Sequence, residues 1–168
     1  ISVIIQRDRK KTNTINLMAP IFQLHIATPE KEVFAEDVTG VTVPTIDGQI
    51  TILGHHLPIV TALKAGELII RNEEKTRPFA IGGGFLEMNG EKMTILADTA
   101  ERADDIDEQR VKEAIARAEQ IKHEKGADHL EFAGMAAKLE RDLARLRVVR
   151  KHRHTGHHGI EHEGIRPE

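Results

Sequence analysis

The sequence predicts an α+β protein, with an N-terminal antiparallel β-sandwich followed by a C-terminal antiparallel two-helix hairpin. Up to Leu96, apolar residues alternate with polar ones in short runs, a pattern typical of half-buried strands. Beyond Asp105, apolar residues recur every three or four positions, which predicts amphipathic helices. The period changes once, within residues 82–110. A single change from strands to helices is typical of two separable units.

The strands of the first unit are predicted from alternation and from the turn signals between them. Phe22, Leu24 and Ile26 are separated by single polar residues, so they should form one apolar face of a strand. Turn signals then recur every ~8–12 residues, as expected for a sandwich or a flattened barrel. The other apolar runs that predict strands are 33–34, 38–43, 50–52, 68–70, 79–81, 85–88 and 93–96.

Two dipeptides predict tight hairpin turns in this unit. Asp47-Gly48 precedes an alternating run, and Asn89-Gly90 lies between two apolar runs. Asn-Gly in this position is the strongest short-range hairpin signal, because both residues tolerate the positive φ of the turn.

The second unit is predicted to be two helices separated at Gly126. Asp105 and Glu108 have the spacing of a capping box, so the first helix should begin with Asp105 as its N-cap. A second capping box at Asp128 and Glu131 should begin the second helix. Apolar residues of the second helix have coiled-coil-like spacing, so the two helices should fold back on each other. The expected seam comprises Phe132, Ala136, Leu139, Leu143 and Leu146.

These patterns divide the chain into four segments. Residues 20–101 are predicted to form the sandwich domain and residues 104–152 the helical hairpin domain. Residues 1–19 lack either periodicity and are expected to be a disordered leader or extension. Residues 153–168 are His-rich and are predicted to be a disordered tail. Histidines of such a tail can chelate Ni²⁺ or Zn²⁺, but a plain hydrophilic extension is the favoured interpretation.

Composition excludes several classes of function. A net charge of −3 gives no indication of a dedicated nucleic-acid binder, and the absence of Cys excludes disulfides, thiolate metal sites and a cysteine nucleophile. No apolar run approaches the ~20 residues that a membrane span needs. Trp and Tyr, which commonly stack on bases or sugars, are absent. Within the folded region no nucleophile–base pair, paired carboxylates or metal-ligand cluster is evident, so neither catalytic residues nor a metal site are predicted.

Five segments carry motifs of one family. Thr94–Ala100 is similar to a V-T-V/I-L-A-D-T-A strand, and Gly82–Glu87 is similar to an S-G-G-F/I-L-E strand. His56–Thr61 resembles a G-H-A-P-L-L-T loop, and Leu63–Leu68 resembles L-K-P-G-E-L. Ile106–Val111 resembles I/L-D-x-x-R-A. Taken together and in their order along the chain, the segments resemble the epsilon subunit of the bacterial F-type ATP synthase, which is called delta in mitochondria.

The resemblance runs from about Phe22 to about Arg150 with almost no gaps. It implies a sandwich of about ten strands and a non-catalytic rotor subunit in the central stalk, coupling ATP synthesis to proton transport. The implied partners are the gamma subunit, the c-ring and the alpha/beta catalytic hexamer, without nucleic acid. Membrane association would occur only through the complex, on the cytoplasmic side of a bacterial cell membrane. The implied helices either fold on the sandwich or extend along gamma, where they inhibit ATP hydrolysis.

The resemblance also implies an interface with the c-ring and gamma at Gln49, His55 and His56. His56 falls on the loop histidine of the family, whereas the position of His55 usually holds Gly or Asn. That preference suits a left-handed backbone conformation, which His tolerates better than most residues. Gln49 replaces an acidic residue that some relatives direct at the ring. An interface role is favoured over plain surface.

Some bacterial members of the family bind ATP between the folded helices. The matching residues in this chain are Glu101, Asp107, Arg110, Arg141 and Arg145. Arginine suits phosphate by charge and by its forked geometry. The alternative is a pair of solvated helix faces, whose ion pairs contribute little to stability. Val111 in place of the motif's Ala, and Gly134 in place of a basic residue, count against binding.

Three classes of function therefore follow from the sequence. The leading prediction is the rotor subunit, with ATP as a possible regulatory ligand and no required cofactor. The second is a freestanding ATP-binding sensor module that needs no gamma subunit. The third, an enzyme, is not supported, because the folded region shows no convergent nucleophile and base, paired carboxylates or metal-ligand cluster. Gly82–Gly84 is not a phosphate-binding loop either, because it leads into a strand and lacks the Lys-Ser/Thr.

Overall fold

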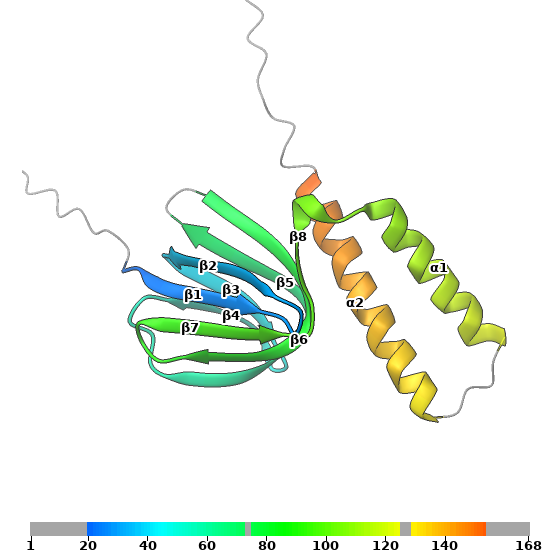
Figure 1. Ribbon diagram of the computed structural model, residues 1–168, viewed down its shortest axis with the longest axis horizontal. Helices are drawn as coiled ribbons and strands as arrows, with labels where there is room; N and C mark the ends of the chain where they lie inside the picture. The colour runs from blue at the N-terminus through cyan, green and yellow to red at the C-terminus, as the bar shows by residue number, and fades with distance from the viewer. Residues whose placement is uncertain (1–19, 73–74, 125–128, 154–168) are drawn as a thin grey trace, which may run out of the picture.

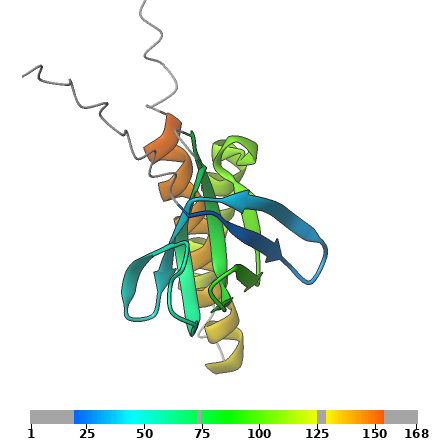
Figure 2. The ribbon, with the colours of Figure 1, turned by 90° about the vertical axis from the view of Figure 1, so that its left-hand side faces the viewer.

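The computed structural model describes residues 20–72, 75–124 and 129–153. It consists of a β-sandwich with two helices lying side by side against one flank (Figure 1). Figure 2, turned by a quarter, shows the helices lying behind the sandwich. The predicted α+β class is confirmed. No helix in the described ranges is long and apolar enough to cross a membrane.

Eight strands are described, and they form one hydrogen-bonded sheet that folds over on itself. The order is β2-β1-β7-β6-β5-β3-β4, with β8 paired to β6. Neighbours are antiparallel except β1 and β7, which are parallel, so the sheet is mixed. The strands are β1 Phe22–Ala27, β2 Glu32–Val38, β3 Gly40–Thr45, β4 Gly48–Leu53, β5 Ile59–Asn72, β6 Lys75–Met88, β7 Lys92–Ala97 and β8 Ala100–Arg102.

About ten strands were expected and eight are described because β5 and β6, each of 14 residues, stay continuous. The two halves of β6 have different neighbours, since Phe79–Ile81 pairs with β8 and Gly84–Met88 pairs with β7. Between them, Gly83 and Gly84 have φ values of 114° and 129°, a region that favours glycine. The triple glycine therefore lies where β6 changes partner.

The sandwich core is made of large apolar side chains from most strands. The predicted face of β1 is confirmed, because Phe22, Leu24 and Ile26 are 2%, 0% and 0% exposed. Phe34 of β2 meets Phe79 of β6 edge to face, with ring centroids 6.0 Å apart. Such a pair adds about 0.5–1.5 kcal/mol to the burial itself. This pair therefore packs β2 against β6, two strands that are not neighbours in the sheet.

The first helix, α1 (Glu108–Glu124), begins two residues later than the predicted cap implies. Asp105 ends a short 3₁₀ helix, η1 (Ala103–Asp105). The cap is Asp107, whose Oδ1 accepts a hydrogen bond from the backbone N–H of Arg110 at 3.1 Å. The predicted cap at Asp105 is therefore wrong, because the chain first turns to bury Ile106 (7% exposed). The second predicted box begins at Asp128, outside the described residues.

The second helix, α2 (His129–Arg153), buries a different face from the predicted seam. Leu139 and Leu146 are partly buried, but Leu143 is 38% exposed and Ala136 is exposed. The seam prediction is wrong at these two positions because α2 contacts β5, β6 and α1 together, not α1 alone. The side chain of Phe132 lies outside the described residues. The buried apolar residues of α2 are Ala144, Val148 and Val149.

Candidate functional site

The helices rest on the sandwich through small side chains. We call this contact the hairpin seat. On the strand side, Gly82 leaves room for the stem of Arg141, because an added Cβ would lie 2.3 Å from Oγ1 of Thr99 and 2.5 Å from Cδ of Arg141. A side chain on β6 at this point would therefore force Thr99 and Arg141 to shift. The buried residues of the seat are Ala80, Ala103, Ile106, Val111, Ile115, Val148 and Val149.

A cavity of about 430 Å³ lies where the two helices meet the end of the sandwich. Four of the five residues predicted for nucleotide binding line it together: Glu101, Asp107, Arg110 and Arg145. They come from β8, from the cap of α1, from its first turn and from α2. The fold therefore brings residues from both units to one place.

The fifth predicted residue, Arg141, does not line this cavity, and its aliphatic stem instead covers Gly82. Sequence reasoning missed two cations that do line it, Arg117 of α1 and Lys138 of α2. On an α-helix, Lys138 and Arg145 are seven residues apart and lie on nearly one line. Arg141 is rotated from that line toward the strands. A helical projection of α2 was the signal available in the sequence.

Arg145 is already paired in this cavity. Its Nε donates to Oε2 of Glu101 at 2.7 Å, and its Nη2 donates to the same oxygen. Its Nη1 lies 3.5 Å from Oδ1 of Asp142. Asp142 has a side chain only 7% exposed, and its Oδ2 has no hydrogen-bond partner among the described residues. A phosphate approaching Arg145 would have to displace Glu101.

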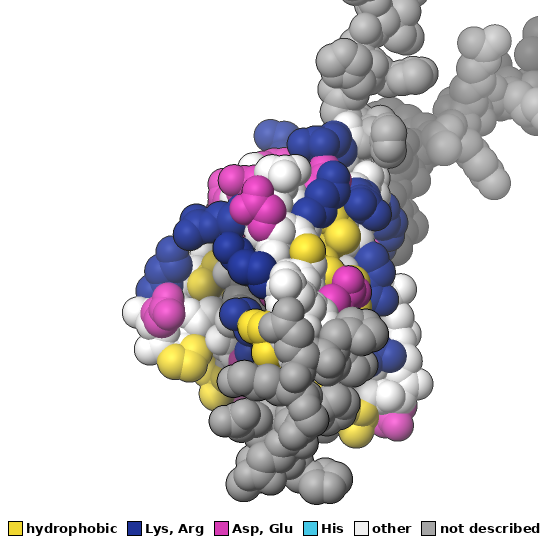
Figure 3. Space-filling model, turned by 90° about the vertical axis from the view of Figure 1, so that its right-hand side faces the viewer, with side chains coloured by type: hydrophobic (Ala, Val, Ile, Leu, Met, Phe, Trp, Pro, Cys, Tyr) yellow, Lys and Arg dark blue, Asp and Glu magenta, His cyan; other side chains and the backbone are white. Residues whose placement is uncertain are grey.

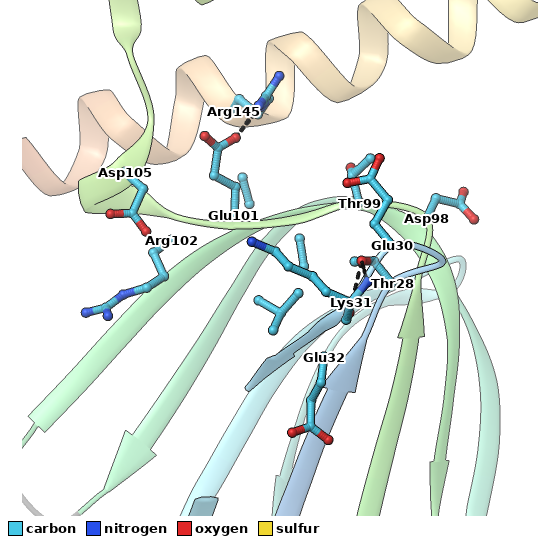
Figure 4. A pocket seen from close by; sticks show the side chains of 13 residues that line it. Thr28, Glu30, Lys31, Glu32, Asp98, Thr99, Glu101, Arg102, Asp105 and Arg145 are labelled. Carbon is cyan, nitrogen blue, oxygen red and sulfur yellow. Dashed lines mark hydrogen bonds and ion pairs between the residues drawn. The ribbon is translucent and has the colours of Figure 1, made fainter. Parts of the chain in front are cut away.

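A second cavity, of about 470 Å³, lies on the other side of Glu101 (Figure 4). There, Glu101 points at Arg145, and the other labelled side chains come from the β1–β2 turn, the start of β2, the β7–β8 turn, β8 and η1. Carboxylates outnumber cations, so this cavity disfavours an anion. The charged residues lining it are Glu30, Glu32, Asp98, Glu101, Asp105, Lys31, Arg102 and Arg145.

The loop after β4 contains two of the predicted interface residues. His55 has φ 62°, so the predicted left-handed conformation is confirmed. Nδ1 of His56 lies 2.8 Å from the carbonyl oxygen of Leu57, which is 80% exposed. The loop and the Asn89–Glu91 turn line one hollow. Gln49, exposed on β4, is not part of it.

An exposed apolar row crosses the outer surface of the sandwich, and sequence reasoning missed it. Val60, Phe85 and Leu96 are 73%, 63% and 59% exposed. Phe85 is paired directly with Leu96 on β7 and with Ala62 on β5. We call these three exposed residues the outer apolar row. Contiguous exposed apolar surface marks interaction sites, and alternation with the buried Leu86 was the available signal.

The surface of the hairpin has a different character. Lys and Arg side chains spread over the face seen in Figure 3, with Asp and Glu side chains and scattered hydrophobic ones among them. The last turn of α2 alone contains Arg150, Lys151, His152 and Arg153. No group of three metal-ligating side chains occurs in the part of the chain that is described. The tail histidines lie outside it.

Both units match known families. Residues 21–103 match the model described as ATP synthase, Delta/Epsilon chain, beta-sandwich domain, and residues 104–150 match the long alpha-helix domain. The ATP synthase epsilon chain of Chloroflexus aggregans is 47% identical over 131 residues, 77% of this chain and 93% of that relative. The epsilon chain of Desulforamulus reducens is 47% identical over 111 residues, 66% and 84% respectively. A chain of the Euglena gracilis mitochondrial ATP synthase has the same fold, with TM-score 0.59 and 20% identity, covering 90% of this chain and 91% of that one.

Proposed function

This chain belongs to the delta/epsilon family of ATP synthase subunits, and from that premise we propose how its two units divide the work. The resemblance stated from the sequence is thereby confirmed. The sandwich joins gamma to the c-ring in the central stalk, and the hairpin limits ATP hydrolysis by the alpha/beta hexamer. The chain supplies no catalytic residue of its own. It is peripheral to a bacterial cell membrane, on the cytoplasmic side, and the complex alone holds it there.

The outer apolar row supports a protein partner for the sandwich. Val60, Phe85 and Leu96 lie on three neighbouring strands, so they form one flat apolar surface. Gamma is the partner proposed for this surface, and the c-ring is proposed for the loop of His55 and His56. Replacing Phe85 with Asp should weaken copurification with gamma without unfolding the sandwich, because the side chain is 63% exposed. The same change at Leu53 on β4, an apolar residue that is 53% exposed, is the control.

The observation that carries the regulatory proposal is the composition of the hairpin seat. Its buried residues are mainly Ala, Val and Ile, and part of the contact is polar. Burial stabilises by roughly 0.8 kcal/mol per CH₂, so small side chains give a modest docking free energy. A modest docking free energy allows the hairpin to leave the sandwich while the sandwich stays folded.

The direct test is reconstitution of the ATP synthase with the full chain and with a chain ending at Ala103. Removing the hairpin should raise ATP hydrolysis severalfold and leave assembly intact, because the sandwich core contains no hairpin residue. Assembly is checked by the stoichiometry of gamma and this chain in the purified complex. An unchanged rate in fully assembled complexes would contradict an inhibitory hairpin.

A second role, ATP sensing, is favoured by the cavity between the helices. Its cations, Arg110, Arg117, Lys138 and Arg145, come from both helices, so a bound phosphate chain would hold the hairpin folded. ATP shifts the equilibrium only by its differential affinity for the folded form. ATP is thus proposed as a regulatory ligand, not as a required cofactor.

Titration of ATP into the isolated chain, followed by helix amide chemical shifts, tests this role. Lys138→Ala should weaken binding by about tenfold, as expected for loss of one charge-assisted contact. Arg141→Ala should have less effect, because Arg141 covers Gly82. No shift at millimolar ATP would exclude both the sensing role and the freestanding sensor. Binding to gamma separates a sensor within the rotor from a freestanding one.

A further inference from the structure

The last turn of α2 is fixed to the sandwich by one carboxylate. Glu67 of β5 has a side chain only 15% exposed, and its Oε2 accepts a hydrogen bond from Nζ of Lys151 at 2.6 Å. Its Oε1 is hydrogen-bonded to Nε2 of His152, whose side chain is 23% exposed. Both partners belong to the final turn of α2, so Glu67 contacts the hairpin at its C-terminal end.

The charge around Glu67 makes this carboxylate hard to replace. A cavity of about 320 Å³ lies between β3, β5 and α2, and the cations Lys64, Arg147 and Lys151 line it. Glu67 is the only carboxylate among its lining residues. Burial raises the pKa of Glu67. Hydrogen bonds from Lys151 and His152, together with the charges of these two residues, lower the pKa by more than burial raises it, so the pKa lies below its ordinary value. The protein environment therefore holds Glu67 charged.

Small residues bring the helix close enough for this contact. Gly66 precedes Glu67 and lets β5 lie close to β3, because an added Cβ there would lie 3.0 Å from the ring of Pro44. Ala144 and Val148 of α2 line the same cavity and are 1% and 2% exposed. Strand and helix therefore approach through small side chains, and Glu67 is within reach of the last turn.

A second carboxylate acts only within the hairpin. Glu108, at the start of α1, bonds Nη1 of Arg153 at 2.6 Å and Nε of Arg150 at 3.4 Å. It also pairs with Lys112 one turn further along α1. These contacts join α1 to α2, whereas those of Glu67 join α2 to the sandwich.

We propose that Glu67 is a docking contact that fixes the last turn of α2 on the sandwich, so that the hairpin is released when this contact opens. The proposal rests on the regulatory role of the hairpin given above. Loss of the Glu67 charge weakens two charge-assisted hydrogen bonds and leaves Lys64, Arg147 and Lys151 with no carboxylate among the residues that line the cavity with them. Glu101 of β8, paired with Arg145, is a second sandwich carboxylate that contacts α2 within the described residues.

The test measures release in the full chain. The sequence has no Cys, so Lys92→Cys on β7 and Glu140→Cys on α2, both exposed, give two unique spin-label sites. Distances between the labels report docking. Glu67→Gln should raise the population at long distance about tenfold, the effect of one charge-assisted contact. The matched control is Glu36→Gln, which removes an ion pair with Arg77 inside the sandwich and should leave the distances unchanged.

A double variant protects the test from a general loss of stability. If Glu67 acts through Lys151, Lys151→Met alone should release the hairpin, and adding it to Glu67→Gln should give little further release. Amide spectra of the strands must match wild type in every variant. Equal distance distributions in wild type and Glu67→Gln, or strictly additive effects of the two changes, would overturn the proposal.

Activity of the reconstituted complex separates this inference from the function on which it rests. With Glu67→Gln, a released hairpin should lower ATP hydrolysis severalfold. Release in the isolated chain with unchanged hydrolysis would support the docking contact and contradict the inhibitory role of the hairpin.

Discussion

The sandwich core and the hairpin seat are held together by different kinds of contact. The core consists of large side chains such as Leu24, Phe79 and Ile95, which are 0%, 1% and 0% exposed. The seat consists of smaller apolar residues surrounded by ion pairs. Large buried side chains stabilise by roughly 1.5–3 kcal/mol each, whereas exposed ion pairs contribute about 0–1 kcal/mol. The sandwich should therefore unfold as one unit, at a higher free energy than the hairpin needs to detach.

The two units therefore differ in the free energy needed to open them as well as in their sequence patterns. Regions with few large buried contacts open at lower free energy than the rest of a protein. The hairpin has such a contact surface, and it is also the unit proposed to move. A change confined to one unit should therefore leave the other unit unaffected.

The largest effect is expected in the sandwich, from Gly84→Ala. An added Cβ would lie 2.1 Å from the carbonyl oxygen of Leu96, and φ at Gly84 is +129°. Both the backbone clash and the strained φ oppose the substitution, so the free energy of unfolding should fall by at least about 3 kcal/mol. Urea denaturation followed by strand signals measures it. Loss confined to the helix signals would contradict the assignment of Gly84 to the sandwich.

The next largest effect should be tighter docking of the hairpin on the sandwich, caused by a substitution at Asp142. Asp142 is 5% exposed, and its Oδ2 has no partner among the described residues. An unsatisfied buried polar group costs about 1–3 kcal/mol. Asp142→Leu removes that group at similar volume and gives up only a 3.5 Å contact with Arg145, which keeps Glu101 as its partner. Docking should therefore be favoured by about 1 kcal/mol, the lower end of the cost of an unsatisfied group. Hydrogen exchange of α2 amides should slow accordingly.

The control for this prediction is Glu140→Leu, at an exposed position two residues earlier on α2. It adds the same side chain without removing a buried charge, so exchange should change little. Equal slowing in both variants would mean that helix propensity, not the buried carboxylate, is responsible.

Gly134→Ala in the hairpin should increase stability by a smaller amount, whereas Gly84→Ala in the sandwich should decrease it. Gly134 lies within α2, and among the described residues an added Cβ there has nothing within 4 Å. Ala should stabilise the helix by roughly 0.5–1 kcal/mol, because Gly is a poor helix former. Helix melting followed by circular dichroism should move upward. Destabilisation would show that Gly134 has a close neighbour in solution.

The sequence predicted elements correctly where a single hydrophobic period determines which face is buried. It failed where contacts with other elements determine the buried face or the helix start. The face of β1 was predicted because Phe22, Leu24 and Ile26 alternate and meet one core. The seam of α2 was mispredicted at Leu143 because heptad spacing assumes one neighbour, and α2 has two. Asp105 was chosen as a cap by spacing alone, and burial of Ile106 moved the cap to Asp107.

Some residues of the candidate site were likewise predictable from the sequence, and others were not. Glu101, Asp107, Arg110 and Arg145 were assigned from motifs of the family, and they line one cavity in this fold. The contact between Glu67 and the end of α2 spans 84 residues and has no motif. Pairings of this kind depend on how two units dock, which no local pattern contains.

The smallest expected effect is that of pH on docking of the hairpin near neutral pH. The sign of this effect follows from the pKa of Glu67. The docked form holds the pKa of this carboxyl below its ordinary value of 4.5, because Lys151 and His152 outweigh the effect of burial. The released form returns the pKa to that value and binds the proton more tightly. Docking free energy from this contact is therefore fully present above about pH 5 and is lost as pH falls through and below 4.5.

Label distances should accordingly be the same at pH 7 and pH 6, and release should grow below about pH 5. Glu67→Gln should flatten this dependence, because it removes the titrating group that joins the two units. The pKa of Glu108 is also lowered, chiefly by its hydrogen bond with Lys112 and despite burial. Its protonation should loosen the hairpin internally, so a residual acid response in Glu67→Gln is expected in α1–α2 distances and not in those between α2 and the sandwich. Release that instead grows between pH 7 and pH 6 would show that a group other than these two carboxyls controls docking.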